Sequence, residues 1–248
     1  MQNPFSLENK TILVTGASSG IGRAIAVECS KMGANVIITA RNKERLAETF
    51  SMLSSNKNQQ IIADLTNEKD HILFVEQLPK LDGLVHCAGI VNTLLFQFVD
   101  AKSLAEVMAV NFTAPTLISA QLVENRRMNK GSSIVFIGSI SGTVCVGGGN
   151  SMYSASKGAI NGIMKNMALD LASKNIRVNS VNPGMIDTQI FDGGLISDEQ
   201  LEEDKKRYPL KRYGKPEEVA YAVIYLLSDA SQWITGSSLV IDGGYTLN

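Results

Sequence analysis

Tyr153 and Lys157 are the residues of this 248-residue chain whose types and spacing point most clearly to chemistry. They stand four positions apart in "YSASK", shortly after the glycines at 147–149, a run that neither a helix nor a strand favours. On a helix the two side chains would share one face, one turn apart. The ammonium group would then favour the ionised phenol and make Tyr153 an acid/base. Two unrelated surface side chains are the alternative for an isolated pair.

A glycine-rich stretch, "TGASSGIG", follows the first apolar run of the chain. Glycines allow positive φ angles and let backbone N–H groups approach a ligand, and the start of the following helix favours an anion. The spacing differs from the G-x-G-x-x-G pattern, so a ligand-free turn between strand and helix is the alternative. We predict a pyrophosphate-binding loop formed by Gly16, Ser18, Ser19, Gly20, Ile21 and Gly22.

The second apolar run ends at Ala40, and Arg41 follows. In a dinucleotide-binding fold an acid at this strand end accepts a hydrogen bond from the ribose 2′-hydroxyl, whereas a cation attracts a 2′-phosphate. The sequence therefore predicts NADP(H) in preference to NAD(H), unless Arg41 only begins a solvated helix. Asp64 ends the third run and is predicted to accept from the adenine amino group, although it can equally cap the next helix.

The elements that would position these residues repeat along the whole chain. Short apolar runs alternate with helical patterns, and they lie at 11–16, 35–40, 60–64, 83–89, 133–139, 177–183 and 238–244. Strands that are apolar on both faces and alternate with helices predict an α/β fold, a doubly wound Rossmann-type parallel sheet of about seven strands with helices on both faces.

No linker divides the chain, so we expect a single domain over 1–248 that combines dinucleotide binding and catalysis. The polar, charged segment at about 190–213 interrupts the alternation of strands and helices. It is either a solvated surface helix or a lid over the substrate.

The composition narrows the class of protein. There are 23 basic and 24 acidic residues with no block of like charge, so neither a nucleic-acid partner nor an anionic membrane surface is indicated. The chain has no apolar run of membrane-spanning length and no signal peptide, so a cytoplasmic location is expected. Cys29, Cys87 and Cys145 are predicted to be buried free thiols, and no metal site is expected.

Several motifs in this order resemble the short-chain dehydrogenase/reductase family. They are "TGASSGIG", "CAG" at 87–89, Asn111, Ser139 with "YSASK", "NPG" at 182–184 and "DGG" at 242–244. The resemblance extends from about Lys10 to the C-terminus. The stretch "RYPLKRYGKPEEVAYAVIYLLSDASQWITG" further resembles the 3-oxoacyl-carrier-protein reductases, although sugar, alcohol and steroid dehydrogenases share much of it.

The resemblance implies an NADP(H)-dependent reduction of a carbonyl to a hydroxyl. Tyr153 would deliver the proton and also contact the cofactor, Lys157 would also hold the nicotinamide ribose, and Ser139 would hydrogen-bond the substrate oxygen. Asn111 would order a water that connects Lys157 to solvent, although an Asn that only kinks a helix is the alternative. Ser139 stands one residue farther from Tyr153 than is common in the family, so Ser141 is a rival.

Further cofactor contacts follow from the resemblance alone. They are expected from Leu65, from Cys87, Ala88 and Gly89, and from Pro183, Gly184, Ile186 and Thr188. His86 and Cys87 replace a usual pair of Asn, and His86 is expected to be a satisfied residue at a strand end rather than a catalyst. The glycines at 147–149 are interpreted as flexible loop residues that let the chain return to the helix that carries Tyr153.

The expected substrate is a small carbonyl compound or an acyl thioester, with acyl carrier protein as a candidate partner. Arg126, Arg127, Lys130 and Lys174 would either bind an acidic carrier protein or solvate helix ends. The alternatives are an alcohol, sugar or steroid-type dehydrogenase of the same family, and a non-catalytic dinucleotide-sensing protein, which would be expected to lack Tyr153 or Lys157. The resemblance also implies a homotetramer.

Overall fold

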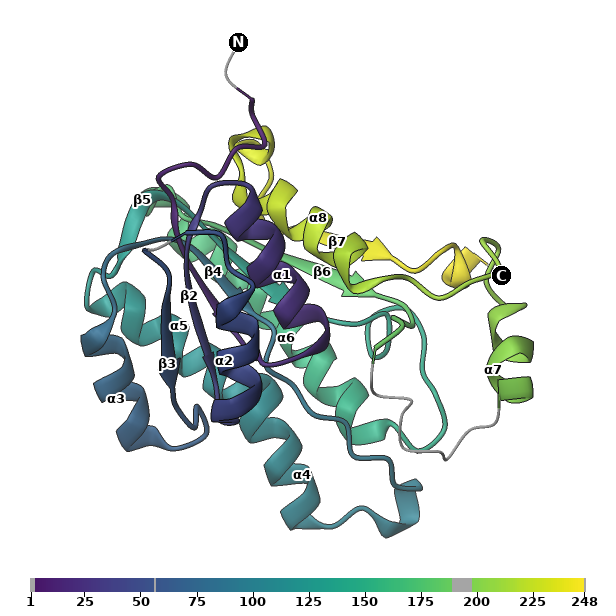
Figure 1. Ribbon diagram of the computed structural model, residues 1–248. Coiled ribbons are helices and arrows are strands. Elements are labelled where there is room, and N and C mark those ends of the chain that lie inside the picture. Colours follow the sequence, from purple (N-terminus) through teal and green to yellow (C-terminus); the bar gives the residue numbers. More distant parts are fainter. Residues whose placement is uncertain (1–2, 56, 189–197, 248) are drawn as a thin grey trace.

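The computed structural model describes residues 3–55, 57–188 and 198–247, and a seven-stranded sheet forms its centre (Figure 1). The strand order is β3-β2-β1-β4-β5-β6-β7, and each strand runs parallel to its neighbours. The strands are β1 Thr11–Thr15, β2 Asn35–Ala40, β3 Gln59–Ile62, β4 Leu81–His86, β5 Met128–Ile137, β6 Arg177–Pro183 and β7 Ser238–Ile241. The predicted doubly wound α/β fold is confirmed.

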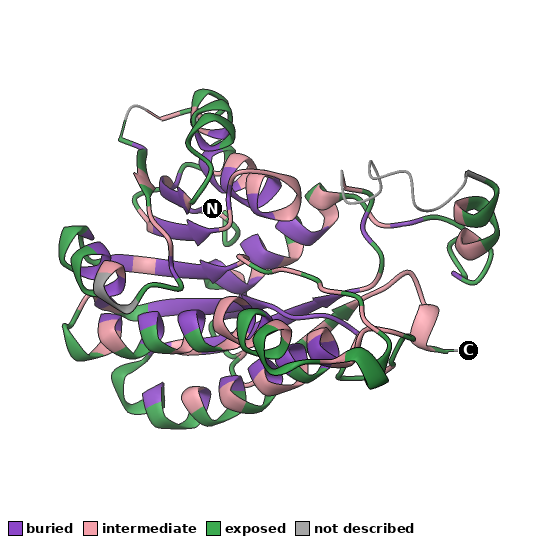
Figure 2. Ribbon diagram, turned by 90° about the horizontal axis from the view of Figure 1, so that it is seen from below, coloured by how far each residue is buried: buried purple, intermediate pink, exposed green. Residues whose placement is uncertain are grey.

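Helices cover both faces of the sheet, and the sheet forms a buried layer between them (Figure 2). The main helices are α1 Gly20–Lys31, α2 Lys43–Ser51, α3 Glu68–Gln77, α4 Ala101–Met108, α5 Ala114–Glu124, α6 Ser151–Leu171, α7 Asp198–Lys205 and α8 Pro216–Leu227. The shorter turns are η1 Phe96–Phe98, η2 Ala109–Thr113, η3 Ala172–Lys174, η5 Asp229–Ser231 and η6 Tyr245–Leu247. Residues of α1, α2 and α8 share one apolar cluster, and residues of α3, α5 and α6 share another.

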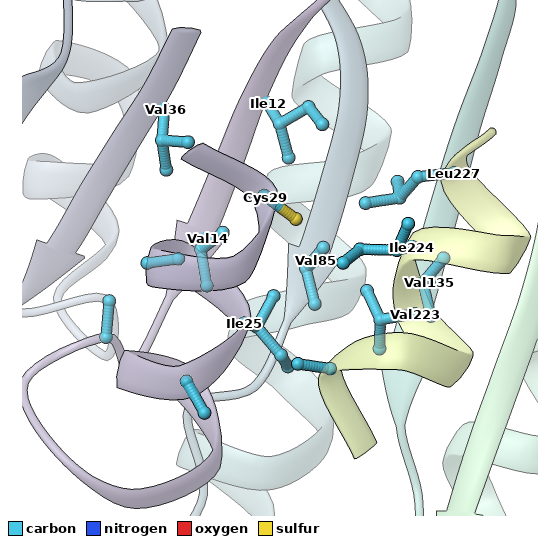
Figure 3. Packing of buried hydrophobic residues seen from close by; sticks show 14 of the residues in the cluster. Ile12, Val14, Ile25, Cys29, Val36, Val85, Val135, Val223, Ile224 and Leu227 are labelled. Carbon is cyan, nitrogen blue, oxygen red and sulfur yellow. The ribbon is translucent and has the colours of Figure 1, made fainter. Parts of the chain in front are cut away.

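The first apolar cluster fills the space between the sheet and the layer of α1 and α8. Ile12 and Val14 point from β1 into this cluster, where they meet Ile25 of α1 and Val223 of α8 (Figure 3). Leu13, which lies between the two β1 residues, belongs to the second cluster. Successive side chains of a strand point to opposite faces, so a strand covered on both sides must be apolar throughout.

The second apolar cluster lies on the opposite face, beneath α3, α5 and α6. Phe136 of β5 packs there with Phe74 of α3, Ile118 of α5 and Ile160 of α6. This cluster supports the inner face of α6, the helix that carries Tyr153 and Lys157. The core therefore holds the helix with the predicted chemistry directly against the sheet.

The start of β5 differs from the sequence prediction. The strand begins at Met128 rather than at Ser133, and its register against β4 shifts between the pairs Leu81/Met128 and Gly83/Ser133. The intervening residues are polar or glycine, a composition typical of a turn. Met128 pairs with Leu81 of β4 beyond this irregular stretch, and so the strand begins earlier than the local sequence signals.

The cysteines agree only in part with the prediction. All three are free, but only Cys29 is buried, whereas Cys87 and Cys145 are half-buried, so the expectation of three buried thiols is wrong for those two. Burial raises the pKa of both Cys29 and Cys87 to about 12. Within the described ranges, no helix is both long and apolar enough to cross a membrane. The same residues contain no cluster of His, Cys, Asp or Glu that could hold a metal ion.

The charged segment predicted at about 190–213 is only partly described, because residues 190–197 lie outside the described ranges. Helix α7 projects from the body of the molecule (Figure 1). The chain after it is anchored by buried aromatic rings: Tyr208 packs edge-on against Tyr213 and also against Tyr245 near the C-terminus. The described part of this segment is therefore a largely exposed helix followed by a turn that buried rings anchor, and the lid over the substrate stays a prediction.

Candidate active site

The order of the strands reverses between β1 and β4, and the predicted site residues follow the carboxyl ends of the strands on either side. The glycine loop follows β1, residues 87–89 follow β4, Ser139 follows β5 and Gly184 follows β6. In doubly wound sheets this edge, at the point where the winding reverses, forms the ligand-binding crevice.

The glycine loop connects β1 to α1 in a compact turn. Gly16 and Gly20 have φ angles of 67° and 52°, and a Cβ atom on Gly22 would lie 2.3 Å from the carbonyl oxygen of Gly16. Ser19 is the N-cap of α1 and makes no capping hydrogen bond through its side chain. The first N–H groups of α1 therefore lack the usual side-chain acceptor, which suits them to a phosphate. The predicted Ser18 and Ile21 lie within this turn.

Thr15, the last residue of β1, joins this loop to the turn after β4, and the sequence analysis did not identify it. Its Oγ1 accepts hydrogen bonds from the backbone N–H of Cys87 at 3.1 Å and of Ala88 at 3.2 Å. A Cβ on Gly16 would lie 2.6 Å from the Cα of Ala88, so glycine is required at this contact. The sequence shows only a hydroxyl-bearing residue at the end of a strand. It does not reveal this role, because the N–H groups that Thr15 binds are more than seventy residues away.

Arg41 and Asp64 lie at the ends of β2 and β3 and face each other. The Arg41 Nη1 is 3.9 Å from Asp64 Oδ2, while Asp64 Oδ1 accepts from both the N–H and the hydroxyl of Thr66. Burial tends to raise the pKa of Asp64, but the hydrogen bonds from Thr66 and the charge of Arg41 outweigh it and lower that pKa. Leu65 is buried beside them. Arg41 and Asp64 line a cavity of about 460 Å³ between β3 and α3.

Tyr153 and Lys157 lie one turn apart on α6. The Nζ of Lys157 is 5.7 Å from the centroid of the Tyr153 ring and donates a 2.7 Å hydrogen bond to the carbonyl oxygen of Ile137 at the end of β5. Lys157 is buried, whereas Tyr153 is half-buried. The cation therefore lies beneath the phenol, and the phenol remains accessible from the crevice.

Asn111 lies where a helix is interrupted, as the alternative of an Asn that kinks a helix expects, and its ordering of a water stays a prediction. The interruption is the π-helical turn η2 between α4 and α5. The Asn111 amide exchanges hydrogen bonds with the backbone N–H and C=O of Ile90, at 2.8 and 2.9 Å, and donates to Ser156 at 3.0 Å. A Cβ on Gly89 would lie 3.4 Å from Asn111 Oδ1 and 3.6 Å from Lys157 Nζ. The three residues thus converge behind the turn at 87–89.

Ser139 and Ser141 differ in what their hydroxyls bind. The Ser139 oxygen accepts a 3.0 Å hydrogen bond from the N–H of Ser141, so its own proton can be donated to a substrate oxygen. The Ser141 hydroxyl is 2.8 Å from that of Ser154, on the buried side of α6. This geometry favours Ser139 as the residue that contacts substrate and makes Ser141 part of the support of α6.

The glycines at 147–149 do more than lengthen the loop before α6. Gly149 has a φ of 75°, and a Cβ there would lie 2.8 Å from Thr93 Cγ2. Its carbonyl oxygen accepts from the N–H of Leu94 at 2.9 Å. The loop before α6 is therefore attached to the chain after β4. A Cβ on Gly148 would meet no atom within 4 Å, as expected for a residue that only lengthens the loop.

The chain leaving β6 crosses back over the glycine loop. Thr188 lies close to this loop, because its Cγ2 would be 3.5 Å from a Cβ on Gly20. Ile186 is buried and forms a bridge with Gly214, while Gly184, directly after Pro183, packs against Asp242. The two sides of the crevice predicted to hold a dinucleotide therefore meet at Thr188.

Comparison with known proteins identifies the family. A family model described as Enoyl-(Acyl carrier protein) reductase matches residues 16–246. The chain is 36% identical over 240 residues to a 3-oxoacyl-[acyl-carrier-protein] reductase of Rickettsia bellii (strain RML369-C), an alignment that covers 97% of this chain and 98% of that protein. The chain belongs to the short-chain dehydrogenase/reductase family. The family recognised from the sequence motifs is confirmed, and the protein is an oxidoreductase.

Relatives of this short-chain dehydrogenase/reductase differ in their substrates. The L-xylulose reductase of Caenorhabditis elegans is also 36% identical, over 253 residues that cover 98% of each chain. Among solved structures, the Pseudomonas aeruginosa RhlG/NADP active-site complex matches with a TM-score of 0.91 and 30% identity, covering 99% of this chain and 100% of that one. Family membership therefore leaves the substrate open.

His86 is a structural residue of this short-chain dehydrogenase/reductase, in line with the expectation of a satisfied residue at a strand end. Its ring stacks on Phe136, with centroids 4.9 Å apart, and its Nε2 is 2.8 Å from the Ser119 hydroxyl. Ser119 donates its own proton to the carbonyl of Pro115, so Nε2 must carry the proton that His86 donates. Burial lowers the pKa of His86 to about 3, which keeps the ring neutral.

Proposed function

We propose that this enzyme reduces the carbonyl group of an apolar substrate, such as a 3-oxoacyl thioester, with NADP(H). One observation carries the proposal: Lys157 lies beneath the ring of Tyr153 on the helix that borders Ser139, at the same sheet edge as the open start of α1. A non-catalytic dinucleotide sensor would need neither member of this pair.

Each residue of the site has a task in such a reduction. A bound nicotinamide supplies the hydride that reaches the carbonyl carbon. Ser139 donates a hydrogen bond to the carbonyl oxygen, and Tyr153 transfers its proton to that oxygen as negative charge develops there, so that C=O becomes CH–OH. The ammonium of Lys157 stabilises the phenolate left behind, which then takes a proton from solvent. Asn111 holds Ile90 and Ser156 in place beside Lys157.

Arg41 supports NADP(H) as the preferred cofactor. No acid occupies the end of β2, where Ala40 stands, and the Arg41 side chain is exposed at the mouth of the crevice. A guanidinium there can pair with a 2′-phosphate, whereas a ribose 2′-hydroxyl would find no carboxylate at position 40. The likeness to a complex that contains NADP points in the same direction.

Exposed apolar side chains on three segments that leave the active-site edge of the sheet support an apolar substrate. These segments follow β4, β5 and β6, and the side chains are Val91, Leu95, Phe96, Val144, Val146 and Met185. The hydrogen bond between Leu94 and Gly149 holds the first two segments together. Exposed apolar side chains gathered at a site are typical of ligand-binding surfaces, and an acyl chain would bury them. A polyol would leave them without matching partners.

The basic residues considered for a carrier protein lie elsewhere. Arg126 and Lys130 flank the start of β5, and Lys174 lies beside them, because Gly131 donates a hydrogen bond to the carbonyl of Asn175. The length of β5, about 30 Å, separates this end of the sheet from Ser139. These residues therefore do not support a carrier protein docked next to this chain's own site, and the thioester itself is the better-supported part of the substrate.

A substrate panel tests the proposal. Purified enzyme is mixed with NADPH or NADH and either acetoacetyl thioester or L-xylulose, and loss of reduced nicotinamide absorbance is followed. We expect the fastest oxidation with NADPH and the thioester. The Tyr153→Phe variant should lose at least about 100-fold in kcat while its Kd for NADPH stays within about twofold, because it removes the proton-donating hydroxyl and leaves most of the predicted cofactor contacts in place.

The Tyr221→Phe variant is the matched control, since Tyr221 is an exposed tyrosine of α8 outside the crevice. It should retain full turnover. Faster turnover of L-xylulose than of the thioester would replace the apolar substrate with a sugar. No oxidation with any carbonyl compound would overturn the reductase proposal itself.

A further inference from the structure

Asn161 lies one helical turn beyond Lys157 on α6, is buried, and uses its whole amide group. Its Nδ2 donates to the carbonyl oxygen of Lys157 at 3.0 Å and to Asn182 Oδ1 at 3.0 Å. Its Oδ1 accepts from the hydroxyls of Ser180 at 2.8 Å and Ser238 at 2.9 Å. An amide with two donors and two acceptor sites is thereby fully satisfied.

The partners of Asn161 on the sheet lie on two neighbouring strands. Ser180 and Asn182 lie on β6, and Ser238 begins β7. Asn182 also donates its Nδ2 to the Ser180 hydroxyl at 3.0 Å. The side chains of Asn161, Ser180 and Asn182 are buried, whereas Ser238 is exposed at the edge of the sheet. We term these four residues the amide network.

The amide network lies directly under the catalytic end of β5. A Cβ on Gly138 would lie 2.0 Å from Asn182 Oδ1 and 3.2 Å from Asn161 Nδ2, so only glycine fits before Ser139. Asn182 itself precedes Pro183 and Gly184, where the chain turns toward Ile186 and Thr188. One pair of amides therefore touches α6, the strand end that bears Ser139, and the segment that leads to the glycine loop.

We propose that Asn161 and Asn182 are positioning residues for catalysis: their hydrogen bond sets how α6 presents Tyr153 and Lys157 to Ser139 and to the chain leaving β6. The proposal rests on the reductase function proposed above. Lys157 reaches the sheet through its Nζ bond to Ile137, and the Asn161 pair provides a second polar attachment one turn later. Ser154 and Ser156 hold the first turns of α6 through Ser141 and Asn111. The Asn161 pair extends these polar attachments one turn beyond Lys157, and so constrains the rotation of the helix against the sheet.

Loss of one partner leaves the other buried without a hydrogen bond. In Asn161→Ala the buried Asn182 Oδ1 loses the hydrogen bond from Asn161, and Ser180 loses one of its acceptors, so α6 or the end of β6 is expected to move to restore these bonds. Displacements of about 1 Å can lower turnover by about 100-fold when the reacting groups depend on geometry. The expected kinetic signature is a fall in kcat that exceeds the change in the Kd for NADPH. Lys157 and the segment after β6 supply only part of the predicted cofactor contacts, and the glycine loop and Arg41 lie away from the amide network.

The experiment compares Asn161→Ala and Asn182→Ala with Asn166→Ala. Asn166 is the matched control, because it lies on α6, is exposed, and donates to the carbonyl four residues earlier, as Asn161 does, but has no partner on the sheet. We expect kcat to fall by about tenfold or more in the first two variants and to remain unchanged in the control. The Kd for NADPH should stay within about twofold in all three.

Hydrogen–deuterium exchange separates this proposal from the reductase function, because it requires no turnover. Exchange at 138–141 and 183–187 should rise in Asn161→Ala and match the wild type in Asn166→Ala. If Asn161→Ala does not fold, Asn161→Ser, which keeps a hydroxyl donor, replaces it in both measurements. Unchanged exchange, or a kcat no lower than that of the control variant, would overturn the positioning role. A wild-type enzyme inactive on every carbonyl would instead contradict only the reductase function.

Discussion

Burial decides which polar side chains of this enzyme are chemically available. Tyr153 keeps access to the crevice although Lys157 beneath it is buried. Cys87 lies in the same region, but burial raises the pKa of its thiol to about 12 despite the opposing charge of Lys157, so it remains a thiol at neutral pH. His86 is neutral for the same reason, since burial disfavours the imidazolium.

The neutral state of His86 predicts a contribution to acid sensitivity. Its pKa is lowered to about 3 in the folded protein, whereas a histidine in an unfolded chain titrates near about 6.5. As the pH falls below that unfolded value, the unfolded chain binds a proton that the folded protein does not. The stabilisation is therefore complete above about pH 6.5 and is lost progressively toward pH 3, with a limiting slope of about 1.4 kcal/mol per pH unit.

His86→Asn removes this titration and keeps a side-chain donor near Ser119. We expect the free energy of unfolding, measured with urea between about pH 7 and about pH 5, to fall less steeply in the variant than in the wild type. Carboxylates contribute equally to both proteins, so the difference isolates residue 86. Parallel pH profiles would show that His86 is not excluded from protonation in the folded state.

At the scale of elements, the active site depends on an irregularity in a helix. The five residues of η2 form a π-helical turn between α4 and α5, and Asn111 occupies its centre. Such turns are rare and recur at functional sites. Here the widened turn directs the Asn111 amide toward Ile90 and Ser156, so a helix, the turn after β4 and α6 are joined by one side chain.

Asn111→Leu should therefore destabilise the protein as well as reduce its activity. The substitution leaves the N–H and C=O of Ile90 without their partner, and each buried unpaired group costs about 1–3 kcal/mol. We expect the free energy of unfolding to fall by about 2 kcal/mol or more in chemical denaturation. Asn125→Ala, which removes an exposed bond to Gln121, is the control and should change stability little. Equal losses in both variants would contradict this account.

At the scale of the whole molecule, one edge of the sheet has an exposed apolar surface. Trp233 is 99% exposed, and Leu169 and Leu247 are 76% and 85% exposed. Gly236 approaches Ala168, which brings the loop before β7 beside the end of α6. β7 is also an edge strand of the sheet (Figure 1), and unpaired edges with apolar neighbours favour association.

We therefore propose self-association through this edge, and the family resemblance implies a homotetramer. Light scattering coupled to size exclusion should show a mass of four chains for the wild type and a smaller species for Trp233→Arg, because a buried cation would oppose the contact. Ile72→Arg, at an exposed apolar position of α3, should leave the mass unchanged. A monomeric wild type, or a Trp233→Arg variant of unchanged mass, would reject this interface.

The sequence by itself determined the fold and predicted where the proposed chemistry lies. The centres of β1 and β2, residues 12–14 and 36–38, are apolar without alternation because both faces of the sheet are covered, and this pattern is readable locally. Tyr153 and Lys157 are four residues apart, so the helical period alone predicted their shared face. The glycine loop was likewise predictable, because its conformation depends on residues that are adjacent in the chain.

Only the tertiary structure decided how these parts are held together. The bonds of Thr15 to residues 87 and 88, of Ser141 to Ser154, and of Asn161 to Asn182 join segments that are distant in the sequence. The early start of β5 likewise depends on its partner strand. A hydroxyl or amide has the same local appearance whether it faces solvent or a buried partner. Its role is set by which backbone the fold brings within hydrogen-bonding distance, and no periodicity in the chain records that.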